Sequence, residues 1–433
     1  GNIFEALTDT HSPDTLALFT KLLNLPDITV TKISQSSNER EVTFTVKSTR
    51  DIIPCRECGK PTRGHGVGRP LHLRHLSLLG KETYIEITPR RGRCDVCDNN
   101  PTTTERLSWY ELNSKMTKPY EQYLLFELIN STIADVSRKE QVDYHCIEHL
   151  IKTYIETEVD FSSIETLGVM GLDEISLKKG YRDFITLITY RVNDKVSILG
   201  VVSGREKAEI KAFLHKIPSR LRSTVTAICC DLYDGYMNAC KEVFENKIPI
   251  VADRFHVRKL YRKSLVNMRK SELKRLKAQL TDTDYADLKK AIAILRKQKD
   301  YFTEEEKPEV EKLFKLSPKL KEAYQFSREL SGLFDSHITP EEAKIKMTEW
   351  IDAVTQSELN CFNQFIKTLV KYQEQICNYF INRNNSGFVE GFNNKVKVLK
   401  RRCYGLSSIT ALFQRLILDT LGLQRFAPGM AAF

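Results

Sequence analysis

Hydrophobic and polar residues alternate with a period of two in the N-terminal part of the chain. The alternation is clearest within residues 27–49, at Glu41-Val42-Thr43-Phe44-Thr45-Val46, and residues 83–88 are also strand-like. Successive side chains of a strand point to opposite faces, so this pattern predicts short strands that are buried on one face. We expect residues 1–110 to form a small β-rich module.

Between residues 117 and 155 the apolar positions follow the period of a helix instead. Tyr120, Leu124 and Leu128 share one face, and the pattern after them accommodates two further helices. Residues 131–152, with a break around residues 139–143, have the proportions of a helix-turn-helix whose second helix could enter the major groove of DNA. A plain helical linker explains the pattern equally well. The predicted helical DNA-binding domain covers residues 111–160.

A third region, residues 161–257, alternates between strands and helices. Strands are predicted at 169–175, 184–191 and 196–202, followed by a helix at 205–216, a strand at 224–231, a helix at 235–245 and a strand at 248–253. The first three strands follow one another directly, so they are expected to be antiparallel. This order, a three-strand meander followed by alternating helices and strands, is the layout of the ribonuclease-H-like fold.

The rest of the chain is predicted to be helical. Residues 258–380 are strongly charged, with a basic run at residues 258–263, and we expect them to form an all-α insertion. Residues 381–433 return to the catalytic core with an amphipathic helix, and a last helix at 407–421 is expected to pack beside it. The predicted fold class is a multidomain α+β protein: an N-terminal zinc-binding β module, a helix-turn-helix-like helical domain, and a ribonuclease-H-like α/β catalytic domain interrupted by the all-α insertion.

The composition adds a basic charge to this picture. The 433 residues carry 66 Lys and Arg against 56 Asp and Glu, a formal net charge of +10, which favours a polyanionic partner such as nucleic acid. Hydrophobic residues make up 41%, as in folded globular proteins, and no apolar run reaches the roughly 18–20 residues of a membrane helix. The N-terminal residues lack the pattern of a secretory signal, so we expect a cytoplasmic protein.

Four of the eleven cysteines form two C-x2-C pairs, Cys55 with Cys58 and Cys94 with Cys97. Each pair can present two thiolates from one turn, and two pairs complete the tetrahedral ligand set of a structural zinc ion. The strand-like residues 83–88 offer a return path across the long gap between the pairs. The other seven cysteines have no pairing pattern, which fits a reducing compartment. Lesser ligand candidates lie in the same module: His65, His72 and His75.

Basic residues crowd the same module: Arg63, Arg69, Arg74, Lys81, Arg90, Arg91 and Arg93. A folded module would collect them into a basic patch that suits contacts with the DNA backbone. Five of them are taken as DNA-binding candidates: Arg63, Arg69, Arg74, Arg91 and Arg93. An ordinary solvated charged surface is the alternative.

Two predicted strands end in aspartate, which is unusual because aspartate forms strands poorly and burying its charge is costly. Asp173 follows Val169-Met170-Gly171-Leu172, and Asp231 follows Ala227-Ile228-Cys229-Cys230. Adjoining strands would bring the two carboxylates together, where they can bridge a metal ion. Carboxylate oxygens favour magnesium or manganese, and two such ions can activate an attacking oxygen and stabilise a leaving oxygen at phosphorus.

The third candidate acid, Glu390, lies early in the amphipathic helix predicted after residue 387. The apolar face of this helix consists of Val389, Phe392, Val396 and Leu399, and Glu390 lies on the opposite face. Basic residues that suit the DNA backbone follow it: Lys395, Lys397, Lys400, Arg401 and Arg402. An ordinary solvated helix face explains the same pattern.

Other acids compete for these roles. Glu174 adjoins Asp173, Asp234 follows Asp231, and Asp253 ends the last predicted strand. Asp253 and His256 are possible accessory residues, and His256 either orients a phosphate or caps local structure.

Four motifs in this order carry a resemblance to a known family: Gly171-Leu172-Asp173-Glu174, Cys230-Asp231 through Tyr236, Val251-Ala252-Asp253-Arg254-Phe255-His256-Val257, and Ser386-Gly387-Phe388-Val389-Glu390-Gly391-Phe392-Asn393-Asn394-Lys395. In these motifs the chain resembles the zinc-ribbon-bearing insertion-sequence transposases of the ISL-three group, within the DDE superfamily of ribonuclease-H-like recombinases. The resemblance covers nearly the whole chain. It implies two catalytic aspartates, a closing glutamate and a zinc site, which match Asp173, Asp231, Glu390, Cys55, Cys58, Cys94 and Cys97.

The resemblance further implies a DNA transposase that binds the terminal inverted repeats of an insertion sequence. Magnesium or manganese would serve catalysis, and zinc would be structural. The partners would be double-stranded DNA, as element ends and as target, and further copies of the chain in at least a dimer, in the nucleoid-associated bacterial cytoplasm. Two other interpretations stay open: a zinc-dependent DNA-binding regulator without catalysis, and a ribonuclease-H-like nuclease or resolvase that does not transpose.

Overall fold

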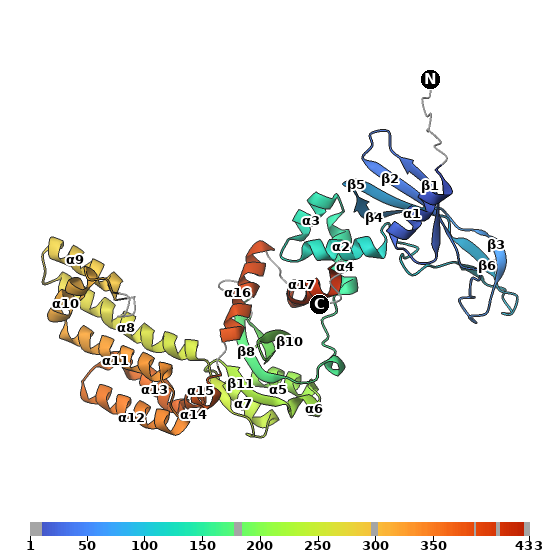
Figure 1. Ribbon diagram of the computed structural model, residues 1–433. Coiled ribbons are helices and arrows are strands. Elements are labelled where there is room, and N and C mark those ends of the chain that lie inside the picture. Colours follow the sequence, from blue (N-terminus) through green and yellow to red (C-terminus); the bar gives the residue numbers. More distant parts are fainter. Residues whose placement is uncertain (1–10, 177–183, 296–301, 385–386, 404–407, 428–433) are drawn as a thin grey trace. The chain divides into compact units, whose positions relative to one another are not determined.

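The chain forms two compact units (Figure 1), the first made of Gly1–Glu156 with Gln414–Phe433 and the second of Thr157–Phe413. The computed structural model describes residues 11–176, 184–295, 302–384, 387–403 and 408–427. Within these ranges no helix is both long and apolar enough to cross a membrane.

The first unit begins with a helix and a four-stranded sheet. Helix α1 (Pro13–Leu23) is followed by β1 (Ile28–Gln35), β2 (Glu41–Ser48), β4 (Leu71–Leu78) and β5 (Lys81–Ile87), in the order β1-β2-β5-β4. The alternation seen in the sequence places Phe44, Leu73 and Ile85 in a common core, where each is at most 1% exposed. The predicted β-rich character of this region is confirmed.

A smaller three-stranded sheet consists of β3 (Arg63–Val67), β6 (Arg90–Arg93) and β7 (Thr102–Thr104), in the order β3-β6-β7. The hairpin of β4 and β5 lies between β3 and β6 in the sequence but belongs to the larger sheet, which explains the long gap between the two cysteine pairs. Gly92 is required at the centre of β6, because a Cβ atom there would lie 1.8 Å from Oγ1 of Thr62.

Three helices complete the first unit's N-terminal segment: α2 (Lys118–Leu128), α3 (Ile133–Glu140) and α4 (Tyr144–Tyr154). Their number and the break between the last two agree with the prediction. The α3 helix ends at Gln141 with a left-handed φ of 54°, and Asp143 then caps α4 by accepting a hydrogen bond from the His145 amide.

The last helix, α17 (Ile409–Phe426), has contacts that the sequence did not predict. The Gln414 side chain donates a hydrogen bond to the Ile155 carbonyl, and the Arg415 guanidinium donates to the carbonyls of Leu128 and Ser131. The sequence placed this helix beside the preceding one in the catalytic region. From Gln414 onwards it belongs instead to the first unit, because its polar groups satisfy the carbonyls where α2 and α4 end.

The second unit contains a five-stranded mixed sheet with the order β10-β9-β8-β11-β12. After the short η1 turn (Phe161–Ser163), β8 (Gly168–Ser176), β9 (Phe184–Val192) and β10 (Lys195–Ser203) are antiparallel neighbours, and β11 (Val225–Cys230) and β12 (Ile250–Ala252) run parallel to β8. Helices α5 (Lys207–Lys216), α6 (Ser219–Arg222) and α7 (Asp234–Val243) connect the later strands. The predicted order of strands and helices in this region is confirmed, except that the short α6 was not predicted.

The all-α insertion follows β12. It contains α8 (Arg254–Lys277), α9 (Asp282–Ile294), α10 (Glu306–Leu316), α11 (Pro318–Asp335), α12 (Pro340–Gln356), η3 (Asn360–Phe362), α13 (Asn363–Lys371), α14 (Gln373–Cys377) and α15 (Tyr379–Asn382). Buried residues of α11 and α12, such as Phe334 and Trp350, share one hydrophobic core with the sheet. The insertion is therefore anchored on the sheet by packing as well as by the chain.

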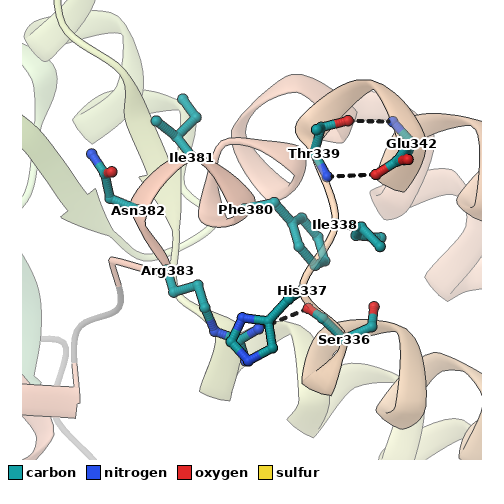
Figure 2. Close-up of a pocket in the computed structure, with 9 residues that line it drawn as sticks. All are labelled: Ser336, His337, Ile338, Thr339, Glu342, Phe380, Ile381, Asn382 and Arg383. Atoms are coloured by element: carbon teal, nitrogen blue, oxygen red, sulfur yellow. Dashed lines mark hydrogen bonds between the residues drawn. The ribbon is translucent and has the colours of Figure 1, made fainter.

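The insertion ends at a pocket of about 370 Å³ (Figure 2). Arg383, which has a left-handed φ of 51°, lines this pocket and donates hydrogen bonds to the carbonyls of Ser336 and Phe334. These bonds fix the point from which the chain leaves the insertion toward α16 (Gly387–Arg402). None of the predicted site residues lines the pocket.

Candidate active site

Three aspartates lie at one level of the sheet because of the register between parallel strands. Leu172 of β8 is paired with Cys230 of β11, and Cys230 is paired with Ala252 of β12. The next residue in each strand direction is an aspartate: Asp173, Asp231 and Asp253. Carboxyl ends of parallel strands are the usual place for ligand sites in open mixed sheets. The structure thus brings the two predicted aspartates together and adds a third.

Asp173 and Asp231 face each other within hydrogen-bonding reach. Asp173 is only 8% exposed, and its Oδ1 accepts a hydrogen bond of 2.7 Å from the Glu174 amide. Burial, reinforced by the negative charge of Asp231, raises the pKa of Asp173 to about 8. Two carboxylates held this close are unfavourable without a cation between them, and that is the condition under which a divalent metal ion binds well.

His256 supplies a positive charge beside this pair in the metal-free protein. Its Nδ1 lies 2.8 Å from Oδ1 of Asp231 and 2.8 Å from Oδ2 of Asp253. Its hydrogen bonds to the two carboxylates raise the pKa of His256 to about 10, although its burial acts in the opposite direction. The imidazole is therefore protonated at neutral pH and holds Asp231 in one orientation.

Asp253 has a structural explanation of its own. It is the N-cap of α8, and its Oδ1 accepts a hydrogen bond of 2.9 Å from the Phe255 amide while Oδ2 faces His256. Ligand atoms of Asp231, Asp253 and His256 all lie within 4.8 Å of one another, so these residues can also hold a metal ion. The signal in the sequence was an acid at a strand end with a histidine three residues later, on the same face of the helix that follows.

The other competing acids are engaged elsewhere. Glu174 lies 2.6 Å from the Arg205 guanidinium, and Asp234 accepts hydrogen bonds from Lys371 at 2.5 Å and from the Tyr372 hydroxyl at 2.8 Å. The interaction with Lys371 and Tyr372 lowers the pKa of Asp234. These pairs tie the strands and α7 to their neighbours, so neither acid competes with Asp173 and Asp231.

Glu390 lies on α16, which runs beside β8, the strand that carries Asp173. Its side chain falls outside the described residues. The predicted apolar face is present, since Phe392, Val396 and Leu399 are buried. Phe388 anchors the start of the helix, with the Arg191 guanidinium 4.8 Å from its ring centre.

The predicted basic residues of α16 divide into two sets. Lys397 and Arg401 are exposed on one side of the helix. Lys395, Lys400 and Arg402 are half-buried and have partners within the protein, and burial lowers the pKa of Lys400. The side of α16 that is open to a large ligand therefore carries Lys397 and Arg401.

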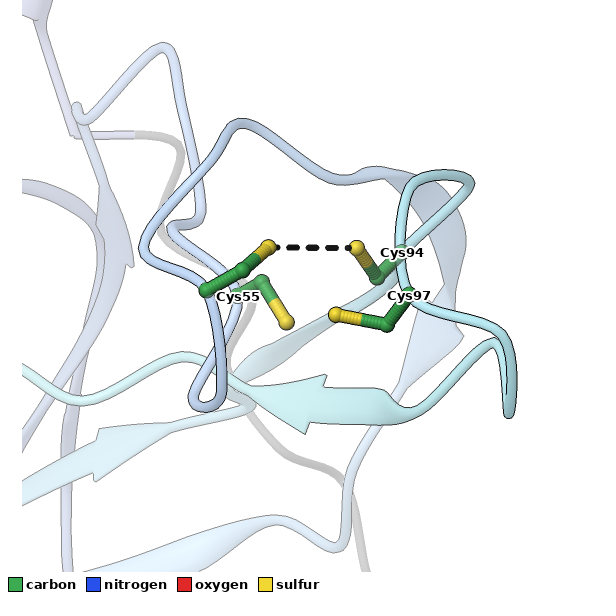
Figure 3. A group of neighbouring side chains, drawn as sticks. Cys55, Cys94 and Cys97 are labelled. Carbon is green, nitrogen blue, oxygen red and sulfur yellow. Dashed lines mark hydrogen bonds between the residues drawn. The ribbon is translucent and has the colours of Figure 1, made fainter.

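The four predicted zinc ligands form a cluster in the first unit (Figure 3). All four sulfur atoms lie within 4.8 Å of one another, and Sγ of Cys58 and Sγ of Cys94 are 3.6 Å apart. A tetrahedral zinc site with bonds of about 2.3 Å places its sulfur atoms about 3.8 Å apart, so the cluster has the required size. The backbone amides of Cys58 and Glu57 lower the pKa of Cys55 to about 7, whereas the side-chain hydrogen bond to Cys58 raises the pKa of Cys97, as expected of thiols that share protons without a metal ion.

Among the predicted DNA-binding arginines of this unit, Arg63, Arg69, Arg91 and Arg93 are exposed. Arg63 is paired with Arg93 across β3 and β6, and Arg91 lies two residues from Arg93, so the three share one face of the small sheet. Arg74 is not part of this surface. Its side chain is 13% exposed, is paired with Glu82, and stacks between the rings of Tyr84 and Tyr120.

The comparisons that cover more than half of the chain agree on one family. The family model of ISL-three (ISL3) DDE transposases, described as a transposase, matches residues 170–416. The transposase of insertion sequence element IS1001 from Bordetella parapertussis is 24% identical over 370 residues, 84% of this chain and 88% of that protein. The transposase of element IS1557 from Mycobacterium tuberculosis is 20% identical over 396 residues, 87% of each protein. A Citrifermentans bemidjiense protein named dihydroorotase matches only 32% of the chain, at 27% identity.

The electrostatic repulsion between Asp173 and Asp231 can be tested through the pH dependence of stability in the metal-free protein. The ordinary pKa of 3.8 applies to unfolded Asp173, whereas the folded carboxyl keeps its proton up to about 8. The folded state binds more protons between these values, so stability is lost as the pH rises through this window. Asn cannot ionise, so Asp173→Asn should raise the free energy of unfolding, on the order of 2 kcal/mol above the window and not at all below it.

Amide hydrogen exchange of β8 and β11 in the presence of EDTA measures this difference across the pH range. Asp194→Asn, in the exposed turn between β9 and β10, is the control and should show no such dependence. A destabilising effect of Asp173→Asn at alkaline pH would mean that Asp173 is a structural carboxylate.

Proposed function

Because the chain belongs to the ISL-three family of DDE transposases, we propose that its second unit cleaves and joins DNA strands with divalent metal ions held by Asp173, Asp231 and Glu390. The observation that carries this proposal is the close pair of carboxylates formed by buried Asp173, within β8, and half-buried Asp231, directly after β11. Asp231 is also paired with His256, but the side-chain partner of the more buried Asp173 is the Asp231 carboxylate and not a cation, unlike the partners of Glu174 and Asp234.

The architecture of the second unit supports the proposal. Three antiparallel strands followed by two parallel strands, with helices between, are the order expected of a ribonuclease-H-like core. We assign residues 161–257 and the helix at the start of residues 381–433 to this core, with residues 258–380 as the insertion. In this arrangement α16 runs along β8, which suits a third carboxylate on α16 at residue 390.

The chemistry follows from the donor set. Carboxylate oxygens favour magnesium or manganese, which supply charge neutralisation at phosphorus and a more acidic attacking hydroxyl. Asp231 is held by His256 and Asp173 by the Glu174 amide, so both carboxylates are oriented before substrate binds. Water would be the nucleophile for strand cleavage, and a DNA 3′-hydroxyl for strand joining. His256 and Asp253 are assigned as positioning residues for Asp231.

The first unit is proposed to recognise the element ends. Arg63, Arg91 and Arg93 present three positive charges from one face of the small sheet, next to the cysteine cluster, and suit the DNA backbone. The α3–α4 pair has helix-turn-helix proportions, so residues 111–160 are assigned to DNA binding together with residues 1–110. On the second unit, Lys397 and Arg401 serve the same purpose. Two ends are joined in one reaction, so at least two copies of the chain would act together.

Catalysis can be tested with purified protein, magnesium and DNA that carries the ends of the protein's own element. Asp231→Ala and Glu390→Ala should each lower strand cleavage and strand joining by roughly 1,000-fold or more, since each removes a ligand used in the transition state. Binding of the same DNA should be unchanged. Asp194→Ala, in the exposed turn between β9 and β10, is the control and should react like the wild type.

Two results would contradict the mechanism or narrow the function. If Asp231→Ala and Glu390→Ala cleave and join as well as the wild type, the carboxylates are not the catalytic ligands. If the wild type binds DNA without cleaving it, the chain acts as a regulator, and if it cleaves without joining it acts as a nuclease.

The cysteine cluster is proposed to hold one structural zinc ion. Metal analysis should find about one zinc per chain, and Cys55→Ser combined with Cys58→Ser should remove it and lower the thermal stability of the small sheet. Cys146→Ser changes an exposed cysteine outside the cluster and should keep the zinc. Zinc-free wild-type protein with an intact small sheet would refute this assignment.

A further inference from the structure

One side of α8 carries a stripe of six residues that the proposed site does not use. The stripe is Phe255, Arg258, Lys259, Arg262, Lys263 and Val266, spaced alternately by three residues and by one, so they share one side of the helix. These six residues line a single groove of about 570 Å³. Four positive charges therefore lie in one groove between two apolar residues.

The charges of this α8 stripe are not neutralised within the part of the chain that the structure describes. No acidic side chain there forms an ion pair with any of the four basic residues, and Nε of Arg258 is buried without a hydrogen-bond acceptor. Burial and the neighbouring charge of Arg258 lower the pKa of Arg262. Like charges gathered this way are unfavourable unless a polyanion binds them.

Arg254, on the same helix, differs from the stripe residues because its guanidinium has partners within the protein. Its guanidinium is paired with Asp335 and donates a hydrogen bond of 3.0 Å to the Tyr379 hydroxyl. Arg254 ties α8 to α11 and α15 and does not line the groove. The stripe residues have no such partners, so packing of the insertion does not explain them.

The position of the stripe relative to the carboxylate cluster indicates that the polyanion is a DNA strand. Phe255 is adjacent in the chain to His256, which contacts Asp231 and Asp253, so the stripe begins at the carboxylate cluster and leads away from it. From Phe255 to Lys263 the helix rises about 12 Å. One strand of a duplex carries one charge per about 3.4 Å of duplex axis, and its successive phosphates are farther apart than this because they also wind around the axis. The stripe is therefore long enough to contact more than one phosphate of a strand.

Phe255 suggests that the ligand of the stripe includes an unpaired base as well as a phosphate backbone. Phe255 is 42% exposed and lies at the end of the stripe nearest the carboxylates. An exposed aromatic ring at the end of a row of positive charges is the arrangement with which proteins bind single-stranded nucleic acid, since a base stacks on the ring while its phosphates meet the charges. A paired base could not reach the ring in this way.

We propose that the α8 stripe binds the backbone of the DNA strand that passes the carboxylate cluster, and that Phe255 stacks on a base of this strand that has become unpaired. This assignment rests on the proposed function, because the strand is the one that the transposase cleaves or joins. It adds a strand-separating contact next to the chemistry, in the insertion and not in the sheet.

DNA affinity of the full chain in EDTA tests the stripe without cleavage. The probes are a labelled duplex with a short single-stranded overhang and a blunt duplex of the same sequence. Lys259→Gln with Lys263→Gln changes only exposed side chains, so folding is preserved. This variant should bind the overhang probe about 10-fold more weakly and lower the slope of log affinity against log salt by about 2. Arg258→Gln with Arg262→Gln should behave likewise.

Lys344→Gln with Lys346→Gln is the matched control, because it removes two exposed charges from α12 of the same insertion. It should bind like the wild type. Phe255→Ala should weaken binding of the overhang probe roughly 5-fold or more and leave binding of the blunt duplex unchanged.

Two outcomes would overturn the proposal. If Lys259→Gln with Lys263→Gln keeps the wild-type affinity and salt slope, the stripe is a solvated helix face. If Phe255→Ala affects both probes equally or neither, no unpaired base stacks there. Asp231→Ala should bind both probes normally in this assay while failing to cleave, so a failure of the stripe is distinguishable from a failure of the catalytic assignment.

Discussion

The parallel register of β8, β11 and β12 is the constraint on which the site depends. It aligns Leu172, Cys230 and Ala252. The aspartates that follow these residues therefore lie side by side, and this placement depends on strand pairing and not on helix packing. Burial makes the repulsion between these carboxylates costly. Without a metal ion, this repulsion is reduced because His256 is protonated and because the pKa of Asp173 is raised. A structure that needed only stability would replace such a pair with apolar residues or a salt bridge. We propose that a divalent ion shared by the carboxylates relieves this repulsion.

Much of the fold follows from local pattern. The order of strands and helices in the second unit and the three helices α2 to α4 follow from periodicity and capping residues alone. The path of the chain between the cysteine pairs does not, because the hairpin of β4 and β5 joins a different sheet, and alternation says nothing of which sheet a strand joins. The contacts of α17 were missed for a related reason: the carbonyls that Gln414 and Arg415 satisfy lie more than 250 residues away in sequence, at separations of 259 and 287 residues.

The site was predictable where a residue type was costly in its local setting. Aspartate after an apolar strand segment is such a signal, and it singled out Asp173 and Asp231 as candidates, although β8 continues past Asp173 to Ser176. Cysteine pairs predicted the cysteine cluster in the same way. Exposure of basic residues was not predictable, because Arg74 and Arg90 find partners in Glu82 and Glu105 that no short-range pattern reveals. The position of His256 between Asp231 and Asp253 could not be predicted from its spacing from Asp253 alone, because it also depends on the register between β11 and β12. The place of Glu390 relative to the aspartates stays a prediction.

A crystal structure of the protein with manganese tests the central claim most directly, because anomalous scattering locates the ion without reference to activity. The account predicts a manganese peak between the carboxylates of Asp173 and Asp231, with the Glu390 carboxylate as a further ligand. Manganese bound only by Asp253 and His256, or no peak at these aspartates at saturating manganese, would contradict it.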